Sequence, residues 1–261
     1  MSAAWNAPSD EEDEHMHISI SISPTPQELG AAAAKKISAL LNDAIARKGA
    51  ARIILSTGAS QFETMDALTR EPVDWTKVEM FHLDEYVGLP ESHIASFRKY
   101  LKERFVSKLP LKAAYFVNGE GDVEKNIAEL TKKLREATVD VGVIGIGENG
   151  HIAFNDPPAD FETDVAYKVV DLDDRCKRQQ VGEGWFATVA DVPKQAITMC
   201  PKQIMSCEHI VSSVPHAVKA EAVYNTLTCK VDPKIPATLM KTHPDWNLFI
   251  DDASAQRLFA L

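Results

Sequence analysis

The sequence contains no long apolar run and no excess of basic residues. No apolar stretch reaches the roughly 20 residues that a membrane-spanning helix requires, so we expect no membrane partner. The formal net charge of −10 argues against nucleic acid or an anionic membrane surface as the main partner. A small anionic substrate is compatible with this charge, because a few backbone amides and a single cation can bind a phosphate locally.

The cysteine pattern excludes two further classes of site. The four cysteines form neither a CxxC pair nor a zinc-type cluster with histidine, so we interpret them as reduced, mostly structural thiols. They are Cys176, Cys200, Cys207 and Cys229. The N-terminus lacks the basic-then-apolar order of a signal peptide and instead carries "SDEEDE" at 9–14. We therefore expect a disordered acidic segment over residues 1–16 and a cytoplasmic location.

Alternating strand and helix patterns fill residues 17–261, which we expect to form a single α/β domain. Thr25, Pro26 and Glu28 are typical of a helix start, and this helix ends near Gly49. Strands are predicted at 17–22, 52–55, 78–83, 114–117, 139–146, 208–214 and 247–250. Helical patterns between most of these strands predict a doubly wound, mainly parallel sheet with helices on both faces.

Four segments rich in polar side chains follow predicted strands. In open parallel sheets, ligands bind in the crevice outside the carboxyl ends of the strands. The four segments can therefore converge on one cleft, which is our main evidence for a site. They are "STGAS" at 56–60, "DEY" at 84–86, "ENGHIAFND" at 148–156 and "PHAVK" at 215–219.

A glycine-rich run at 145–150, "GIGENG", fits the GxGxxG pattern of dinucleotide-binding proteins. In those proteins the last glycine opens a helix whose N-terminus holds the pyrophosphate. Here Gly150 is followed by "HIAFNDPPADF", and two successive prolines do not belong in such a helix. We interpret the glycines as a tight turn that directs Asn149, His151 and Asp156 toward the crevice.

The "STGAS" segment is the better candidate for binding an anion. It follows a strand and precedes a helix, so free amides around Gly58, Ala59 and Ser60 would favour a phosphate. Thr57 and Ser60 can add hydroxyl donors, and Lys219, in the first turn of a later helix, can add a cation. Each feature alone has an ordinary alternative: a structural βα turn and a solvated surface lysine.

Asp84 and His151 are the candidates for proton transfer. A carboxylate at a strand end, directed inward, suits proton abstraction next to a carbonyl, although Asp84 and Glu85 can equally cap the following turn. His82, Asp84 and Glu85 do not suit a metal ion, because neighbours in a strand point to opposite faces. His151 is the only one of eight histidines framed by a glycine turn and polar partners.

Taken together, these segments resemble glucosamine-6-phosphate deaminases, also called isomerases, which share a superfamily with 6-phosphogluconolactonases. The resemblance runs from about Ile18 to the C-terminus and is carried by "LSTGAS", "DEYVGLP", "GIGENGHIAFND" and "VKAEAV". Tyr86 after the acid pair, and Phe154 and Asn155 after the histidine, look like the deaminase branch. The resemblance implies a Rossmann-like fold that binds no nucleotide and uses no metal or organic cofactor.

The implied reaction converts glucosamine 6-phosphate and water to fructose 6-phosphate and ammonia, so the expected partner is a small phosphorylated amino sugar. The resemblance implies that His151, oriented by Asp156 and Asn149, helps to open the sugar ring. It also implies that Asp84 moves a proton between C2 and C1. The implied substrate-binding residues are Thr57, Gly58, Ala59, Ser60, Glu85, Tyr86 and Lys219.

The sequence departs from the best-known family pattern at several positions. Asn149 stands where many members have aspartate, and Asp156 stands where glutamate is usual. The phosphate-binding arginine of the hexameric members aligns with Gln180. Residues around Ala159 and Ala166 lack the side chains that would bind an amino-sugar effector, so we expect no such allostery. The sequence leaves monomer and homo-oligomer open.

Two alternative functions also fit the sequence. A sugar-phosphate lactonase would use His151 to activate water and would need no carbon base at Asp84. A non-catalytic sugar-phosphate sensor would use the same cleft for binding alone. The lack of a basic face weighs against a sensor that acts on DNA.

Overall fold

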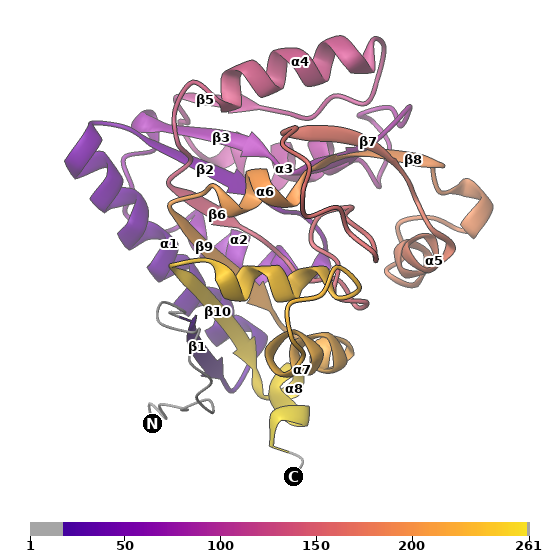
Figure 1. Ribbon diagram of the computed structural model, residues 1–261. Helices are drawn as coiled ribbons and strands as arrows, with labels where there is room; N and C mark the ends of the chain where they lie inside the picture. The colour runs from indigo at the N-terminus through magenta and orange to yellow at the C-terminus, as the bar shows by residue number, and fades with distance from the viewer. Residues whose placement is uncertain (1–17, 260–261) are drawn as a thin grey trace.

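The computed structural model describes residues 18–259; residues 1–17 and 260–261, which include the predicted acidic segment, lie outside the described residues. Seven strands form one parallel sheet in the order β1-β10-β9-β6-β2-β3-β5 (Figure 1). This confirms the predicted α/β fold with a mainly parallel sheet. The strands are β1 (Ile18–Ser23), β2 (Ala51–Leu55), β3 (Val78–His82), β5 (Ala113–Tyr115), β6 (Val141–Val143), β9 (His209–Val214) and β10 (Trp246–Asp251).

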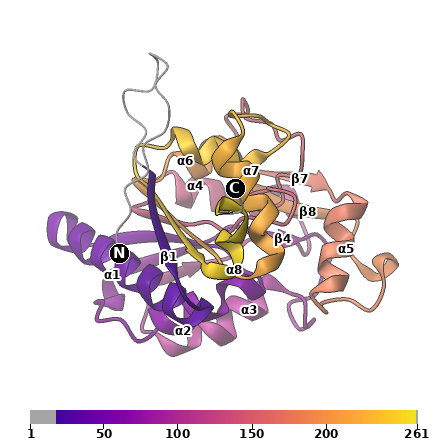
Figure 2. The same cartoon turned by 90° about the horizontal axis from the view of Figure 1, so that it is seen from below.

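Helices cover both faces of this sheet (Figure 2). Successive residues of a strand point to opposite faces, so Ile53 and Leu55 enter one hydrophobic core and Ile54 enters the other. The first core includes residues of α1 (Pro26–Lys48), α2 (Phe62–Leu68) and α3 (Phe97–Arg104). The second core includes residues of α4 (Val123–Leu134), α6 (Pro201–Met205), α7 (Ala220–Thr228) and α8 (Asp252–Ala255).

The start and end of α1 match the sequence prediction. The Thr25 hydroxyl accepts a hydrogen bond from the Glu28 amide (3.2 Å), and Pro26 occupies the first turn. At the other end Gly49 adopts a left-handed conformation with φ of 76°, and its amide donates to the Ile45 carbonyl. The predicted strand over 139–146 is shorter than expected, because only Val141–Val143 pairs as β6.

A second, smaller sheet was not foreseen in the sequence. It is antiparallel, with the order β4-β8-β7, and consists of β4 (Asp84–Tyr86), β8 (Gln195–Met199) and β7 (Tyr167–Asp171). The chain passes from β3 through Leu83 directly into β4, so the small sheet starts at the carboxyl end of the large one. Helix α5 (Asp174–Gly182) lies between β7 and β8 in the chain.

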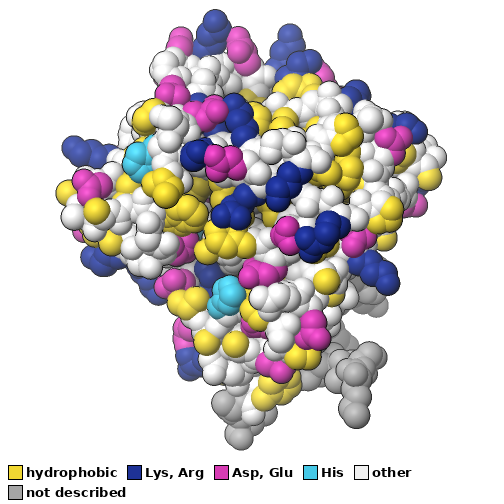
Figure 3. Space-filling view, turned by 180° about the vertical axis from the view of Figure 1, so that it is seen from behind, with side chains coloured by type: hydrophobic (Ala, Val, Ile, Leu, Met, Phe, Trp, Pro, Cys, Tyr) yellow, Lys and Arg dark blue, Asp and Glu magenta, His cyan; other side chains and the backbone are white. Residues whose placement is uncertain are grey.

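The surface of the described residues is mixed in charge. On the face shown in Figure 3, lysine and arginine side chains are interspersed with acidic and apolar ones. Among residues 18–259, no helix is both long enough and apolar enough to cross a membrane.

Candidate active site

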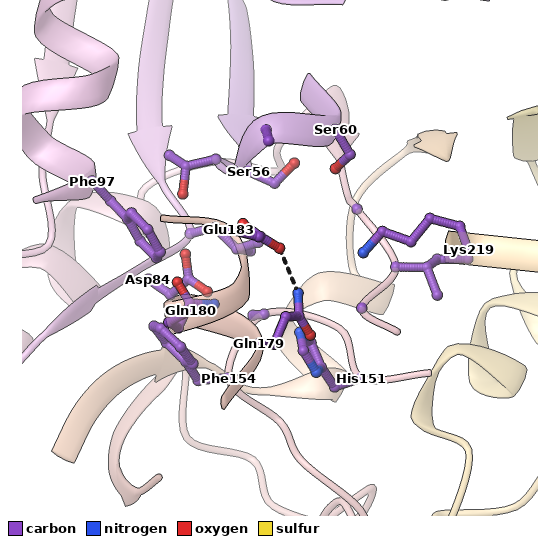
Figure 4. A pocket seen from close by; sticks show the side chains of 18 residues that line it. Ser56, Ser60, Asp84, Phe97, His151, Phe154, Gln179, Gln180, Glu183 and Lys219 are labelled. Carbon is purple, nitrogen blue, oxygen red and sulfur yellow. Dashed lines mark hydrogen bonds between the residues drawn. The ribbon is translucent and has the colours of Figure 1, made fainter. Parts of the chain in front are cut away.

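A cleft with an empty volume of about 570 Å³ lies at the carboxyl ends of the parallel strands. Each of the four polar segments singled out in the sequence contributes to the wall: Ser56–Ser60, Asp84, His151 and Lys219 are among the lining residues (Figure 4). The predicted convergence of these segments is therefore present in the structure.

Asp84, the first residue of β4, lines the cleft and is 6% exposed. Burial penalises its charged form, and the neighbouring charge of Glu85 adds to the effect. Together they raise the pKa of Asp84 to about 8. Its carboxyl group is therefore able to hold or release a proton close to neutral pH.

Glu85, the next residue of the same strand, points away from the cleft and is fully buried. Its carboxylate accepts hydrogen bonds from the Ser96 hydroxyl (2.9 Å) and from the amides of Phe97 (3.2 Å) and Arg98 (2.9 Å). The Arg98 guanidinium lies 3.3 Å away. Glu85 thus fixes the start of α3 from behind the site, and the structure does not place it where we expected it to touch a substrate.

Tyr86 likewise stands behind the cleft wall instead of lining it. Its ring is buried against Phe97 and Phe154, and its hydroxyl donates a hydrogen bond to Gln180 Oε1 (2.7 Å). Gln180 does line the cleft. Because Tyr86 occupies the carbonyl oxygen of this amide, the amino group of Gln180 is left for a ligand. Any effect of Tyr86 on a substrate would therefore pass through Gln180.

The glycine turn positions His151 at the cleft. A Cβ atom on Gly147 would lie 2.2 Å from the imidazole, so only glycine leaves room for the ring there. Gly150 has a φ of +83°, a conformation that glycine adopts at no steric cost. The run at 145–150 therefore serves to place a histidine, in agreement with the sequence analysis.

Two polar residues support His151 from outside the cleft. Asp156 Oδ1 lies 3.3 Å from His151 Nδ1, and Asn149 Nδ2 donates to the same oxygen (3.3 Å). Asn149 Oδ1 in turn accepts the backbone amide of His151 (3.0 Å). Burial raises the pKa of Asp156, but the hydrogen bond and charge of His151 and the bond from Asn149 outweigh it and hold the pKa below its usual value. Asp156 is thus placed to orient the imidazole and to stabilise its protonated form.

The opposite part of the cleft is suited to an anion. Lys219 is 6% exposed, lies just before α7 and points its ammonium into the cleft (Figure 4). Within residues 18–259 this ammonium has no ion-pair partner, and burial lowers its pKa, although Glu183 and Glu148 act against the shift. The buried Ser56 hydroxyl, also in the wall, has no hydrogen-bond partner among the same residues. A buried, unpaired cation is costly, so an anionic ligand would complete this part of the site.

The loop after β2 borders Lys219. Thr57, Gly58, Ala59 and Ser60 all line the cleft, and Gly58 has a φ of +102°. The first amides of the helical turn that follows have no partner within the helix and can donate to an oxyanion. The four residues of this loop that we expected to bind the substrate are therefore at the cleft wall, as is Lys219.

The sequence analysis missed a third group of lining residues, which comes from the end of α5. Gln179, Gln180 and Glu183 face the cleft (Figure 4). Gln179 Nε2 donates to Glu183 Oε1 (2.8 Å), and Trp185 Nε1 donates to Glu183 Oε2 (3.0 Å). From the sequence, Gln180 stands out only as the position that aligns with a phosphate-binding arginine. The one available signal was a polar helix, "DRCKRQQVG", without a wide apolar stripe.

No metal centre accompanies these groups in the described part of the chain. Between residues 18 and 259, no three or more histidine, cysteine, aspartate or glutamate side chains are grouped so that they could hold a metal ion. The four cysteines are free thiols, and none of them lines the cleft.

Comparisons with known proteins point to one family. The sequence model described as glucosamine-6-phosphate isomerases/6-phosphogluconolactonase matches residues 24–248. A glucosamine-6-phosphate deaminase of Streptococcus pyogenes serotype M1 is 33% identical over 220 residues, covering 84% of this chain and 92% of that protein. One from Listeria monocytogenes serovar 1/2a is 34% identical over 205 residues, covering 78% of this chain and 86% of that protein.

Solved structures agree on the fold. A structure described as a monomeric glucosamine-6-phosphate deaminase, a "missing link of the NagB superfamily", is 28% identical and superimposes with a TM-score of 0.83. It matches 91% of this chain and 99% of its own. A 6-phosphogluconolactonase from Trypanosoma brucei is 18% identical with a TM-score of 0.74, over 93% of this chain and 99% of its own.

Proposed function

Because this chain belongs to the family of glucosamine-6-phosphate isomerases and 6-phosphogluconolactonases, we propose that it is a glucosamine-6-phosphate deaminase. The reaction converts glucosamine 6-phosphate and water to fructose 6-phosphate and ammonia. Relatives that carry the deaminase name cover most of the chain at about one-third identity. The family model covers both activities, whereas the solved 6-phosphogluconolactonase structures are below one-fifth identity and show a likeness of fold alone.

One observation carries the proposal. A buried carboxyl group with a pKa of about 8, at Asp84, shares a cleft with an imidazole–carboxylate pair and with a buried ammonium that lacks a partner. A lactonase needs the imidazole and the ammonium but has no use for a second acid tuned close to neutral pH. A deaminase needs that acid, because it must move a proton between two carbon atoms.

The steps assign a task to each part of the cleft. Lys219 and the loop at 57–60 hold the phosphate, and His151 transfers a proton between the ring oxygen and O1 as the ring opens. Asp84, as carboxylate, removes the C2 proton of the open-chain aldehyde and returns it to C1, while the amino nitrogen gives up one proton and O1 takes one up to become a hydroxyl. The result is the imine of fructose 6-phosphate, to which water adds at C2 before ammonia leaves. Burial of the Asp84 carboxyl increases its basicity for this transfer.

The test is to assay one protein preparation for ammonia release from glucosamine 6-phosphate and for hydrolysis of 6-phosphogluconolactone. We expect ammonia release in the wild type and its loss in Asp84→Asn, with the melting temperature showing that the variant is folded. Lactone hydrolysis without ammonia release would overturn the proposal in favour of a lactonase. A ligand-induced rise in melting temperature without turnover of either compound would favour a sensor.

We further propose that the protein acts in the cytoplasm, where phosphorylated amino sugars are metabolised. Its oligomeric state can be measured directly by light scattering, which separates a monomer from a homo-oligomer. The 28%-identical structure described as monomeric supports the former.

A further inference from the structure

The carboxylate of Glu183 lies in the cleft wall, and the steps above give it no task. It follows α5 directly, as the residue that caps the helix. Gln179 donates to one of its oxygens (2.8 Å; Figure 4) and Trp185 to the other (3.0 Å), so two side chains hold the carboxylate in one orientation. A long acidic side chain held in this way is costly in conformational entropy, which an ordinary solvated glutamate avoids.

The chemistry of a carboxylate limits what it can bind. Each of its oxygens can accept about two hydrogen bonds, so one donor on each leaves further lone pairs open. It cannot donate, which excludes direct contact with a phosphate. The fitting ligand groups are a sugar hydroxyl or an ammonium, and the ammonium gives the stronger, charge-assisted bond.

Glu183 and Lys219 give the cleft one charge of each sign. The charge of Glu183 acts on the Lys219 ammonium, but the two groups do not form an ion pair within 4.0 Å. Glu183 follows Gln179 and Gln180 at the end of α5, and the hydroxyl of Tyr86, two residues after Asp84, donates to Gln180, so the segment that carries Glu183 borders the reacting part of the cleft. A ligand with an anionic group at one end and a cationic group at the other matches this arrangement.

We propose that Glu183 binds the C2 ammonium of the substrate and thereby selects amino-sugar phosphates over sugar phosphates that lack nitrogen. This inference rests on the proposed function. Held at Glu183, the ammonium would lie beside the carbon whose proton Asp84 removes. The carboxylate would thus orient C2 toward Asp84, while Lys219 fixes the phosphate at the other end of the chain.

The experiment compares two open-chain ligands that have no carbonyl group and therefore cannot react. They are 2-amino-2-deoxyglucitol 6-phosphate and glucitol 6-phosphate, which differ at C2 only. Calorimetry gives the dissociation constant of each for the wild type and for Glu183→Gln. We expect the wild type to prefer the amino ligand, and the variant to lose about 10- to 100-fold of this preference, the size of one hydrogen bond between charged groups.

Glu148 offers a matched control. Its charge also acts on Lys219, but its side chain does not line the cleft. If Glu183 acts by contact, Glu148→Gln keeps the wild-type preference; if both variants lower it equally, a general field is responsible and the proposal is wrong. Equal weakening of both ligands by Glu183→Gln would also overturn it.

A second variant covers the case in which Glu183→Gln does not fold. Glu183→Asp keeps the charge but withdraws it by one methylene, and we expect its preference for the amino ligand to be smaller than that of the wild type. An unchanged preference in Glu183→Asp would refute the contact. The ammonia assay of the wild type is independent of these measurements, so failure of the deaminase function and failure of the Glu183 inference are told apart.

Discussion

The two ends of the cleft are built from different parts of the fold. The anion-binding end comes from the large parallel sheet, through the loop after β2 and Lys219 after β9. The reacting end combines Asp84 of the small antiparallel sheet, Gln180 and Glu183 from the end of α5, and His151 from the glycine turn after β6. The first end offers backbone amides and a buried ammonium, whereas the second offers carboxyl groups, an amide and an imidazole. Binding and chemistry can therefore be changed separately, which mutant kinetics can test.

The largest effect is expected at the reacting end. Asp84→Asn removes the base for carbon, so kcat should fall by about 10³-fold or more, in the range typical of general acid–base catalysis. The dissociation constant for glucitol 6-phosphate should stay within about threefold of the wild type, because no phosphate contact is lost. Stopped assays of ammonia release and calorimetry measure the two quantities.

The neighbouring acid supplies the control for this prediction. Glu85→Gln leaves Arg98 without its buried carboxylate and disturbs the amides of Phe97 and Arg98. The free energy of unfolding should fall by about 3 kcal/mol in urea denaturation, as when one partner of a buried ion pair is removed. If Asp84→Asn destabilised the fold as strongly, its kinetic effect would not be evidence for chemistry.

A substitution at the anion-binding end should change KM. Lys219→Met removes the only cation among the described residues that line the cleft. We expect KM to rise by about 10- to 100-fold, since a hydrogen bond to a charged group contributes about 1.5–3 kcal/mol, while kcat changes little. Lys219→Arg keeps the charge and should recover part of the loss. A fall in kcat as large as the fall in kcat/KM would show instead that Lys219 acts in the transition state.

The contrast between the two ends also explains what the sequence could predict. The anion-binding end follows from strand order, because carboxyl ends of parallel strands meet at one edge whatever the details of packing. In the small sheet, β4 has only three residues and pairs with β8, which lies beyond α3, α4 and α5 in the chain, so periodicity alone did not reveal this sheet. The position of Gln180 and Glu183 depends on how α5 packs, which no local pattern encodes.

The position of Glu85 follows from strand alternation. Because successive residues of a strand point to opposite faces, His82, Asp84 and Glu85 do not form a metal site. The same alternation places Glu85 behind the cleft whenever Asp84 faces it, as the structure shows. The residues at the start of α3 that bond to Glu85 could not be named from the sequence. Their position depends on how the loop between β4 and α3, which includes Leu89 and Ser96, folds back onto the strand.

The pH dependence follows from the raised pKa of Asp84. Only the carboxylate is a base, so kcat/KM should rise about tenfold per pH unit up to about pH 8 and then level off. Between the usual pKa of 3.8 and about 8, the folded state holds a proton that the unfolded state lacks. The Asp84 contribution to stability therefore falls as pH rises through this window, and Asp84→Asn should remove that loss. Rate profiles and urea denaturation at pH 5 and pH 8 measure both effects.

One result at pH 8 would contradict the raised pKa of Asp84. If the melting temperature of Asp84→Asn, relative to the wild type, does not increase between pH 5 and pH 8, then Asp84 is ionised at neutral pH in the free protein. The rise in kcat/KM would then reflect the ionisation of another group, and the assignment of proton transfer at the reacting end to Asp84 would need revision.

The smallest effect tests whether a residue behind the wall acts on the reacting end. Tyr86→Phe removes the donor to Gln180 Oε1 and frees that amide to turn. We expect about 1–3 kcal/mol of lost stability from the unpaired buried oxygen, and a KM increase of about threefold. Tyr167→Phe is the matched control: this tyrosine is also buried in the small sheet and donates to the His82 carbonyl (2.8 Å), but it does not line the cleft and its hydroxyl does not bond to Gln180. A similar stability loss in both variants, with KM raised in Tyr86→Phe alone, would identify Tyr86 as a positioning residue; equal KM values would reduce it to a core residue.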